Sequence, residues 1–500
     1  MPSVFGTAVP GKGSYRGVRA KLFGMYIQDD LRVRSNLTLN LGVRYEPATT
    51  MTEANGLTTN LRNLWDAQIT AGQPMYKNPT LRNFAPRVGL AWDPTGTGKT
   101  SVRAGFGMFN VLPLPNLLSG NLNHTVPFNL NATVVRPPSS TFPNQILPLL
   151  TPDAGSGYYM QGDPPRAYKV QWNLNIERQI TSGLSITAGY VGSRGVHLPL
   201  RYGDLNLVPP FLVKTAPDGH LLFPSGPAQR VNPNFPLIPA TLWNGYSIYH
   251  SGQLNVTQRF AHGFTFQGVY AWSKNIDVGS SEVNRSDNFN NVDNGYGFRP
   301  GLNRGVADWD VPHHLALNAV WNLPNPSIHS VVPRFLLSGW ELGGIFTAQS
   351  GMPFSATIAA DRAGTGTAAG NANGQRPDYN PAPGCSTNAV NPGHPESYIK
   401  LQCFAFPAAG TLGNLGRNTL RAPGIQDFDF SLFKNHNLLG EKMKVQFRVE
   451  AFNVFNRANF GARVASLING RGAYVPGNAA LKAPTVTTSR QIQFGTKLIW

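Results

Sequence analysis

The chain has 500 residues, of which only 13% are charged and 11% are aromatic, while 53 are glycine and 41 are proline. Such a composition is typical of strands joined by loops, and the absence of a run of about eighteen apolar residues excludes a helical membrane protein. The formal net charge of +17 suggests nucleic-acid binding. However, the basic residues are scattered and no nucleic-acid-binding motif accompanies them, so we expect no nucleic-acid partner.

Segments in which apolar and polar residues alternate recur along the chain. In 36–46, for example, Leu37, Leu39 and Leu41 alternate with Thr38 and Asn40. Segments 168–177, 443–451 and 491–500 behave in the same way, and looser copies lie near 20–32, 84–92, 101–109, 184–190, 246–260, 264–272, 313–323, 336–349 and 427–434. Because successive strand residues point to opposite faces, this pattern predicts an all-β chain with roughly 12 to 14 strands that each have one apolar face.

The connections between these segments alternate in length. Short or medium connections lie near 33–36, 93–99, 179–183, 260–263, 324–335 and 435–442, and long ones at 47–83, 110–165, 194–245, 275–309, 350–424 and 456–487. Outer-membrane β-barrels have short turns at the periplasmic rim and long extracellular loops. The pattern therefore predicts an antiparallel transmembrane β-barrel in contact with outer-membrane lipid, with Trp500 at the periplasmic rim.

Aromatic residues near the ends of many predicted strands indicate the two girdles that such barrels carry at the membrane interfaces. The candidates are Tyr45, Trp92, Tyr190, Tyr270, Trp272 and Trp321. Ordinary enrichment of aromatic residues in strands is the alternative explanation.

The strand phases also place basic residues on the polar face, which would line the lumen of a barrel. These are Arg44, Arg87, Lys169, Arg259, Lys444, Arg448 and Lys497, against fewer acids such as Glu46, Glu177 and Glu450. Charges along a partly dehydrated wall cost free energy unless they are paired. The phases therefore predict an acidic plug or an anionic solute as the counterpart of this wall.

The two cysteines, Cys385 and Cys403, both fall in the longest predicted outer loop, about 350–424. An even pair in an oxidising compartment predicts a disulfide that closes this loop, and two free thiols are the alternative.

Motifs for catalysis or for cofactors are weak or absent. Gly96-Thr97-Gly98-Lys99-Thr100 resembles a phosphate-binding loop, but the first glycine is replaced by Asp93 and no helix pattern follows. His313 and His314 have no carboxylate or cysteine at the spacing of metal ligands. We therefore expect neither an enzyme nor a cofactor or metal site.

Several short stretches together resemble the barrel of Oar-like TonB-dependent outer-membrane receptors. They are Tyr26-Ile27-Gln28-Asp29-Asp30, the segment 37–46, Tyr190 to Gly195, Gly413 to Asn418, Asp429 to Lys434, Phe452 to Asn456 and Arg490 to Gly495. The resemblance covers the chain from about residue 20 to its end. The tail also resembles the signal read by the barrel-assembly machinery, with Gly495, Leu498 and Trp500 in register, although Thr496 departs from the usual apolar residue.

The resemblance implies a signal peptide, a regulatory-like domain, a segment that contacts TonB and a plug domain, followed by a barrel of about twenty-two strands. Residues 1–19 lack the apolar core of a signal peptide and are expected to be a lead-in, with the barrel at 20–500. The chain is thus expected to be a partial, C-terminal barrel without its plug. A complete twelve-stranded barrel is the alternative.

The function implied by the resemblance is energised uptake, through TonB, of a large or scarce solute that the sequence does not name. A passive porin or structural outer-membrane protein is one alternative. A soluble or surface β-protein that binds carbohydrate is the other.

Overall fold

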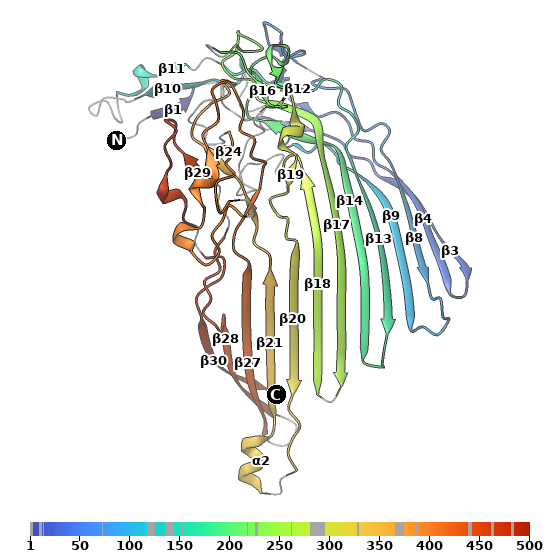
Figure 1. Ribbon diagram of the computed structural model, residues 1–500. Coiled ribbons are helices and arrows are strands. Elements are labelled where there is room, and N and C mark those ends of the chain that lie inside the picture. The colour runs from blue at the N-terminus through green and yellow to red at the C-terminus, as the bar shows by residue number, and fades with distance from the viewer. Residues whose placement is uncertain are drawn as a thin grey trace.

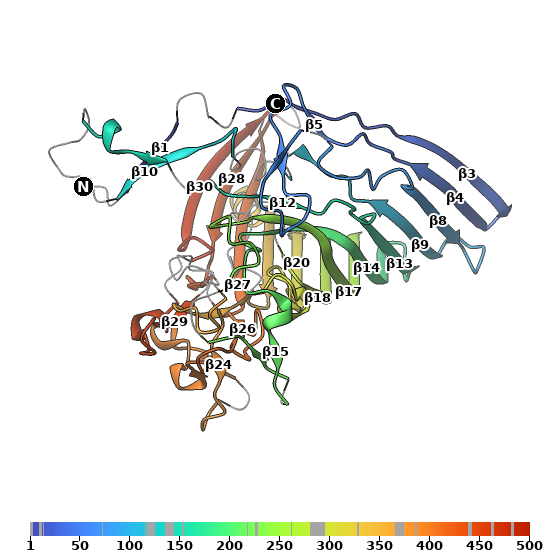
Figure 2. The ribbon, with the colours of Figure 1, turned by 90° about the horizontal axis from the view of Figure 1, so that it is seen from above.

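The structure, a computed structural model, describes residues 4–500 except 10–12, 14, 73, 116, 118–125, 136–144, 153–154, 218, 226–228, 262, 281–295, 328–329, 366–374, 386–387, 439–442, 462–464 and 482–484. One large curved sheet dominates the described part (Figures 1 and 2). The strands of this sheet are joined by short turns at one end and by an extensive layer of loops at the other (Figure 1).

Successive antiparallel strands form the main path of this sheet. They are β3 (Met25–Arg34), β4 (Leu37–Tyr45), β8 (Phe84–Trp92), β9 (Thr100–Asn110), β13 (Tyr168–Gln179), β14 (Leu184–Tyr202), β17 (Ala240–Ala261), β18 (Phe264–Asp277), β20 (His313–Asn322), β21 (Trp340–Gln349), β27 (Ile425–Leu438), β28 (Met443–Phe452) and β30 (Gln491–Ile499). Off this path, β12 (Tyr159–Met160) pairs with β17 and β19 (Gly305–Val306) pairs with β18, which makes a 15-stranded sheet. The predicted antiparallel all-β class is confirmed.

Short strands form small sheets within the loop layer. The pairs and triples are β1 (Val4–Ala8) with β10 (Asn131–Val135) and β11 (Thr151–Pro152), β2 (Val18–Arg19) with β5 (Thr52–Glu53), β6 (Thr59–Asn60) with β7 (Thr70–Ala71), β15 (Lys214–Thr215) with β16 (Leu221–Leu222), β22 (Pro353–Phe354) with β26 (Leu420–Arg421), β23 (Ala356–Ile358) with β29 (Ala465–Ile468), and β24 (Asp378–Tyr379) with β25 (Phe404–Ala405). The helix α2 (Val331–Leu337) lies in the connection between β20 and β21. No described helix is long and apolar enough to cross a membrane.

The connections alternate in length as predicted. The segments between β3 and β4, β8 and β9, β13 and β14, and β17 and β18 are tight turns, whereas the intervening connections are long. All the long connections emerge at the end of the sheet where the loop layer lies, and the C-terminus lies at the opposite end (Figure 1). This arrangement matches a barrel wall whose last strand ends at the periplasmic rim.

The described sheet is open at β3 and β30, which do not pair with each other. Because its main path contains an odd number of strands that alternate in direction, β3 and β30 run the same way. An antiparallel closure between them is therefore impossible, so the described residues do not form the complete twelve-stranded barrel that the sequence left as an alternative.

The antiparallel pair β14 and β17 is longer than the alternation of apolar and polar residues in the sequence predicts. Expected near 184–190 and 246–260, the two strands continue to Tyr202 and begin at Ala240, and their register shifts at Leu198. The extension packs into the loop layer, where Leu200 is buried. Burial on both sides removes the alternation that marks a lipid-facing strand.

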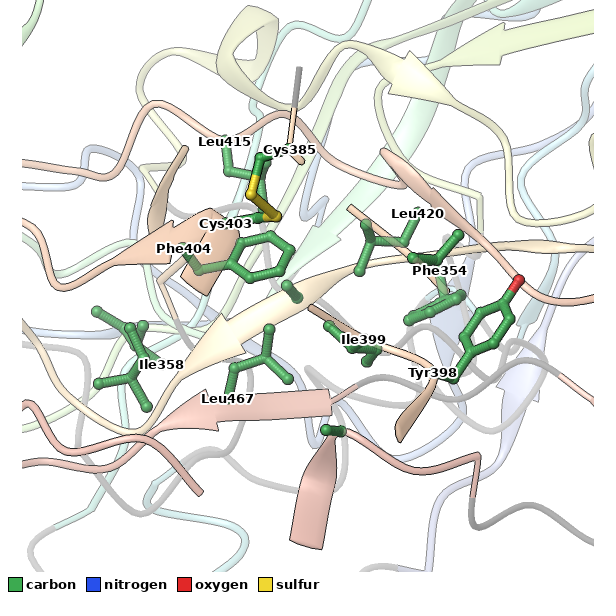
Figure 3. Close-up of a cluster of buried hydrophobic side chains, with 14 residues drawn as sticks. Phe354, Ile358, Cys385, Tyr398, Ile399, Cys403, Phe404, Leu415, Leu420 and Leu467 are labelled. Carbon is green, nitrogen blue, oxygen red and sulfur yellow. A yellow bond between two sulfur atoms is a disulfide. The ribbon is translucent and has the colours of Figure 1, made fainter. Parts of the chain in front are cut away.

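The buried hydrophobic side chains of this chain lie mainly in the loop layer rather than in the wall. One cluster joins the connections 350–424 and 453–490 and contains Phe354, Ile358, Tyr398, Phe404 and Leu467, around the disulfide (Figure 3). Burial raises the pKa of Tyr398 to about 12, and its hydroxyl donates to the Arg421 carbonyl oxygen at 2.7 Å. Three further clusters lie under the earlier connections. The outer loops thus form a folded cap.

Candidate functional site

Strand register assigns side chains to the two faces of the sheet. Directly paired residues share a face, and one such row runs from Gly107 through Gln171, Ser193 and Tyr249 to Asn275. We call the face that carries this row the polar face and the opposite one the apolar face. In a barrel the polar face lines the interior and the apolar face meets lipid.

The apolar face carries two bands of aromatic side chains. Tyr190, Tyr270 and Trp272 lie toward the loop layer, whereas Phe264 and Trp321 pair near the short turns. Phe264 and Trp272 on β18 are separated by about 27 Å along the strand at ~3.4 Å per residue. A strand tilt of ~40° reduces this to a height of about 21 Å, which lies within the ~25 Å apolar band of outer-membrane barrels. The remaining predicted girdle residues, Tyr45 and Trp92, lie on this face too.

The histidine that opens β20 belongs to the loop-side aromatic band. The His313 ring stacks on Tyr270 with centroids 6.2 Å apart, and Nδ1 lies 2.8 Å from the Tyr270 hydroxyl. Tyr190 and His250 repeat the arrangement with a separation of 2.6 Å. Among the residues that the structure describes, no three His, Cys, Asp or Glu side chains gather as metal ligands.

The predicted basic residues fall into two groups along the polar face. Arg44, Arg87 and Lys169 lie toward the loop layer, and Lys444, Arg448 and Lys497 lie toward the short turns. Arg259 lies next to a register irregularity after Gln258, so pairing does not assign its side chain to a face.

Several of these cations already have neighbours within the chain. Arg44 forms an ion pair of 2.6 Å with Glu46, and Arg87 lies over the Phe109 ring at 4.8 Å. Arg448 donates to Gln446 at 2.7 Å. Lys169, in contrast, makes no ion pair with any residue that the structure describes.

The polar face is less basic than the strand phases suggest. Register places further acids there, on β3, β18, β21 and β27, where the sequence alternation is weaker: Asp30, Asp277, Glu341, Asp427 and Asp429. These add to Glu177 and Glu450, while the same register adds Arg32 and Arg103 to the cations, so the opposite charges on this face nearly balance. The net charge of this face therefore gives no reason to expect an acidic plug or an anionic solute. The remaining reason is a cation without an ion pair among the described residues, above all Lys169.

A hollow of about 330 Å³ lies on the polar face just beneath the cap. It spans the neighbouring strands β13, β14, β17 and β18, and two rows of paired residues form its wall: Gln171, Ser193, Tyr249 and Asn275 in one, and Lys169, Ser247 and Asp277 in the other. Val191, Leu198, Gly279, Ser280 and Trp309 complete the lining. A larger hollow of about 510 Å³ contains Arg44 and Arg87 and lies at the open edge formed by β3, whereas the first is lined by both the wall and the Trp309 loop.

Trp309 is presented to this hollow by two buried neighbours. Its side chain is 49% exposed, whereas Asp308 and Asp310 are almost fully buried. Asp310 Oδ1 accepts from the Asn275 backbone N–H at 2.6 Å, and Asp308 Oδ1 accepts from Asn418 Nδ2 at 2.7 Å. The backbone on both sides of Trp309 is therefore held, which fixes the position from which the indole projects.

Arg417 ties the longest loop to the wall beside the hollow. Its guanidinium donates to the Asn303 carbonyl oxygen at 3.0 Å, to Ser280 Oγ at 3.1 Å and to the carboxylate of Asp277, and it also pairs with Asp308. Arg417, Asp277, Asp308 and Asn303 are buried, and hydrogen bonds to charged groups are stronger away from water. The Asp277 carboxylate in the hollow is thus already neutralised by a cation.

The structure also locates the other residues singled out from the sequence. Cys385 and Cys403 form a disulfide, with Cα atoms 5.4 Å apart. Gly495 pairs with Arg448 and Leu498 with Val445 on β28, while Trp500 follows β30 and is 89% exposed.

Sequence reasoning missed the key residues of the hollow other than Lys169. Trp309 lies in a loop, where no alternation marks it, and Asp277 and Arg417 are more than a hundred residues apart in the chain. The available signal was the sequence Asp308-Trp309-Asp310, in which a large aromatic residue stands between two acids in a loop.

Opposite polar and apolar faces, aromatic bands at two levels and alternating connection lengths define the wall of a transmembrane β-barrel. The sequence agrees: the chain belongs to the outer membrane beta-barrel domain family, whose model matches residues 5–493. The protein is therefore an outer-membrane protein, and the soluble alternative is wrong. No curated protein is detectably similar in sequence.

Solved structures of outer-membrane transporters are similar to the chain. The transporter YddB from Escherichia coli is 12% identical over 95% of this chain and 45% of its own, with a TM-score of 0.45. The ferric enterobactin receptor PfeA from Pseudomonas aeruginosa is 12% identical over 96% of this chain and 44% of its own, with a TM-score of 0.45. The copper transporter OprC is 10% identical over 96% of this chain and 49% of its own, with a TM-score of 0.43. The chain spans less than half the length of each of these proteins.

Proposed function

We propose that the chain forms the wall and outer loops of a TonB-dependent receptor, of the Oar-like type, for energised uptake of a large or scarce solute. The observation that carries the proposal is the hollow beneath the cap. It is built from four strands of the wall and from a loop that buried ion pairs hold in place. Such a preformed concave site suits capture of a specific solute.

A passive porin would have a different arrangement at the outer end of the wall. Its polar face borders an open aqueous channel, and solutes pass without being held. In this chain the outer connections pack on one another through buried clusters and fold over the rim. A capped site of this kind favours capture followed by an energised release step.

In this proposal the chain supplies only part of the working receptor. A plug would fill the lumen and meet the polar face, TonB would act on the plug, and the barrel-assembly machinery would insert the wall through the C-terminal strand. The proposal assigns the chain no catalytic step and no cofactor.

The proposal is tested with the full-length product of the gene that encodes this chain, reconstituted in planar bilayers. We expect no steady conductance from the intact protein, and large steps after its plug region is deleted. A steady open conductance from the intact protein would instead establish a passive porin.

A further inference from the structure

We infer that the hollow beneath the cap binds a short acidic saccharide through Trp309, Lys169 and the polar side chains between them. This inference rests on the proposed function, because it names the class of solute that the receptor would capture. Three chemical features of the hollow support it: neutral hydrogen-bonding side chains, aromatic rings and a lysine.

The wall of the hollow offers neutral groups that both donate and accept hydrogen bonds. Gln171, Ser193 and Asn275 lie in one row of paired residues, and Ser247 lies in the next. Amide and hydroxyl side chains each provide donors and acceptors. A ligand dense in hydroxyl groups matches such a surface, whereas an apolar ligand would leave these groups unpaired at a cost.

Two aromatic rings, Trp309 and Tyr249, line the same hollow. The face of an aromatic ring is electronegative, so it attracts the weakly positive C–H groups on one side of a sugar ring. Trp309 is half exposed, and the anchored neighbours Asp308 and Asp310 hold its backbone in place. Little conformational entropy is then lost when a sugar packs on the indole.

The third feature is a cation, Lys169, that forms no ion pair with the residues that the structure describes. Lys169 lies in the row that ends at Asp277, and Arg417 already neutralises the Asp277 carboxylate. One lysine is a point charge, which suits a single carboxylate, whereas phosphate groups are commonly held by arginine forks. The hollow therefore matches one carboxylate on an otherwise hydroxyl-rich ligand.

The positions of these features set the size of the ligand. Lys169 lies on β13, and the Trp309 loop is bonded to β18, three strands away. Three spacings of ~4.8 Å place the two elements about 14 Å apart. Together with the volume of about 330 Å³, this span suits a disaccharide.

The test uses the full-length product of the gene in detergent, with cellobiouronic acid, a disaccharide that carries one carboxylate, and its methyl ester as probes, measured by calorimetry. We expect the acid to bind at least tenfold more tightly than the ester. Lys169→Met should remove this preference, and Trp309→Leu should weaken binding of the acid at least tenfold. Trp65→Leu, which alters an exposed indole outside the hollow, should bind as the wild type does.

Other results would contradict either the saccharide inference or the receptor proposal. Equal binding of both probes, or an acid preference that survives Lys169→Met, overturns the inference. Binding of a ferric siderophore at this hollow, lost in Trp309→Leu, also overturns it but leaves the receptor proposal intact. Steady conductance of the same preparation in bilayers would contradict the receptor proposal itself. Heat-modifiable migration on gels shows that each variant is folded.

Discussion

Arg417 connects three parts of the chain through one buried side chain. It joins the longest loop to the end of β18 at Asp277 and to the 278–312 connection at Asn303 and Asp308. Removing one partner from a buried charge group leaves the others uncompensated, which typically costs about 3–5 kcal/mol. Arg417 is therefore the residue whose loss should most weaken the attachment of this loop to the wall.

We predict that Arg417→Met opens the loop 350–424 without preventing barrel assembly. Hydrogen exchange followed by mass spectrometry should show faster exchange in this loop and unchanged exchange in β27 and β28. As a control, Lys77→Met removes an ion pair with Asp163 that is exposed on both sides, and should change little. Unaltered exchange of the loop in Arg417→Met would show that the ion pairs do not hold it.

The contacts of Glu53 predict that the stability of the first long loop depends on pH. Burial would raise the pKa of its carboxyl, but the backbone N–H groups of Leu57, Gly17 and Asn55, at 2.8, 2.9 and 2.8 Å, outweigh burial and lower the pKa. A group whose pKa is lowered on folding stabilises the folded state above its unfolded pKa, near ~4.3. That stabilisation is lost as the pH falls through the folded pKa.

Glu53→Gln should therefore loosen the loop 46–83 near neutral pH and not in acid. Limited proteolysis should cleave the variant faster than the wild type with a neutral protease, and at the same rate with pepsin below the folded pKa. A difference of equal size at both pH values would mean that the carboxylate charge is not responsible.

At the scale of elements, the disulfide closes part of the longest loop. Cys385 and Cys403 are 18 residues apart and both are buried in the cluster of Figure 3. A link of this length stabilises by about 3 kcal/mol, largely through the entropy of the unfolded chain.

We expect protein purified without reductant to show no free thiol until it is unfolded and reduced. The double variant Cys385→Ser, Cys403→Ser should expose the loop to protease at a lower temperature. Labelling of both cysteines in the native, unreduced protein would contradict the pairing.

The last strand makes a separate prediction about assembly. β30 pairs with β28 along its whole length, Leu498 lies on its apolar face, and Trp500 follows its last residue. If the tail is the assembly signal that its sequence resembles, deletion of Trp500 should leave most of the full-length protein in the periplasm, where it is degraded. Outer-membrane fractions are compared by immunoblot with Trp65→Leu as the control. Equal levels for the deletion and the wild type would exclude this role.

At the scale of the whole molecule, the wall could be predicted and the cap could not. Alternation in segments such as 168–177 follows from contact with lipid on one side, and this contact does not depend on distant residues. The hollow depends on pairs such as Asp277 with Arg417, which approach only when a loop folds back on the wall. On β21, Gly343 and Gly344 lie on opposite faces and blur the phase that would assign Glu341. On β27, Asp427 and Asp429 alternate with Phe428 and Phe430, so their face could be predicted.

Both proposals require that the polar face border the interior and the apolar face meet lipid. This is measured by nitroxide labels placed one at a time at Gln253, Leu254, Asn255 and Val256 of β17, in the full-length protein in bilayers. The two cysteines of this chain do not interfere, since both are in the disulfide. We predict that labels at 254 and 256 collide more with dissolved oxygen, and labels at 253 and 255 with a water-soluble nickel complex. Collision rates without this alternation, or with the opposite phase, would contradict the account.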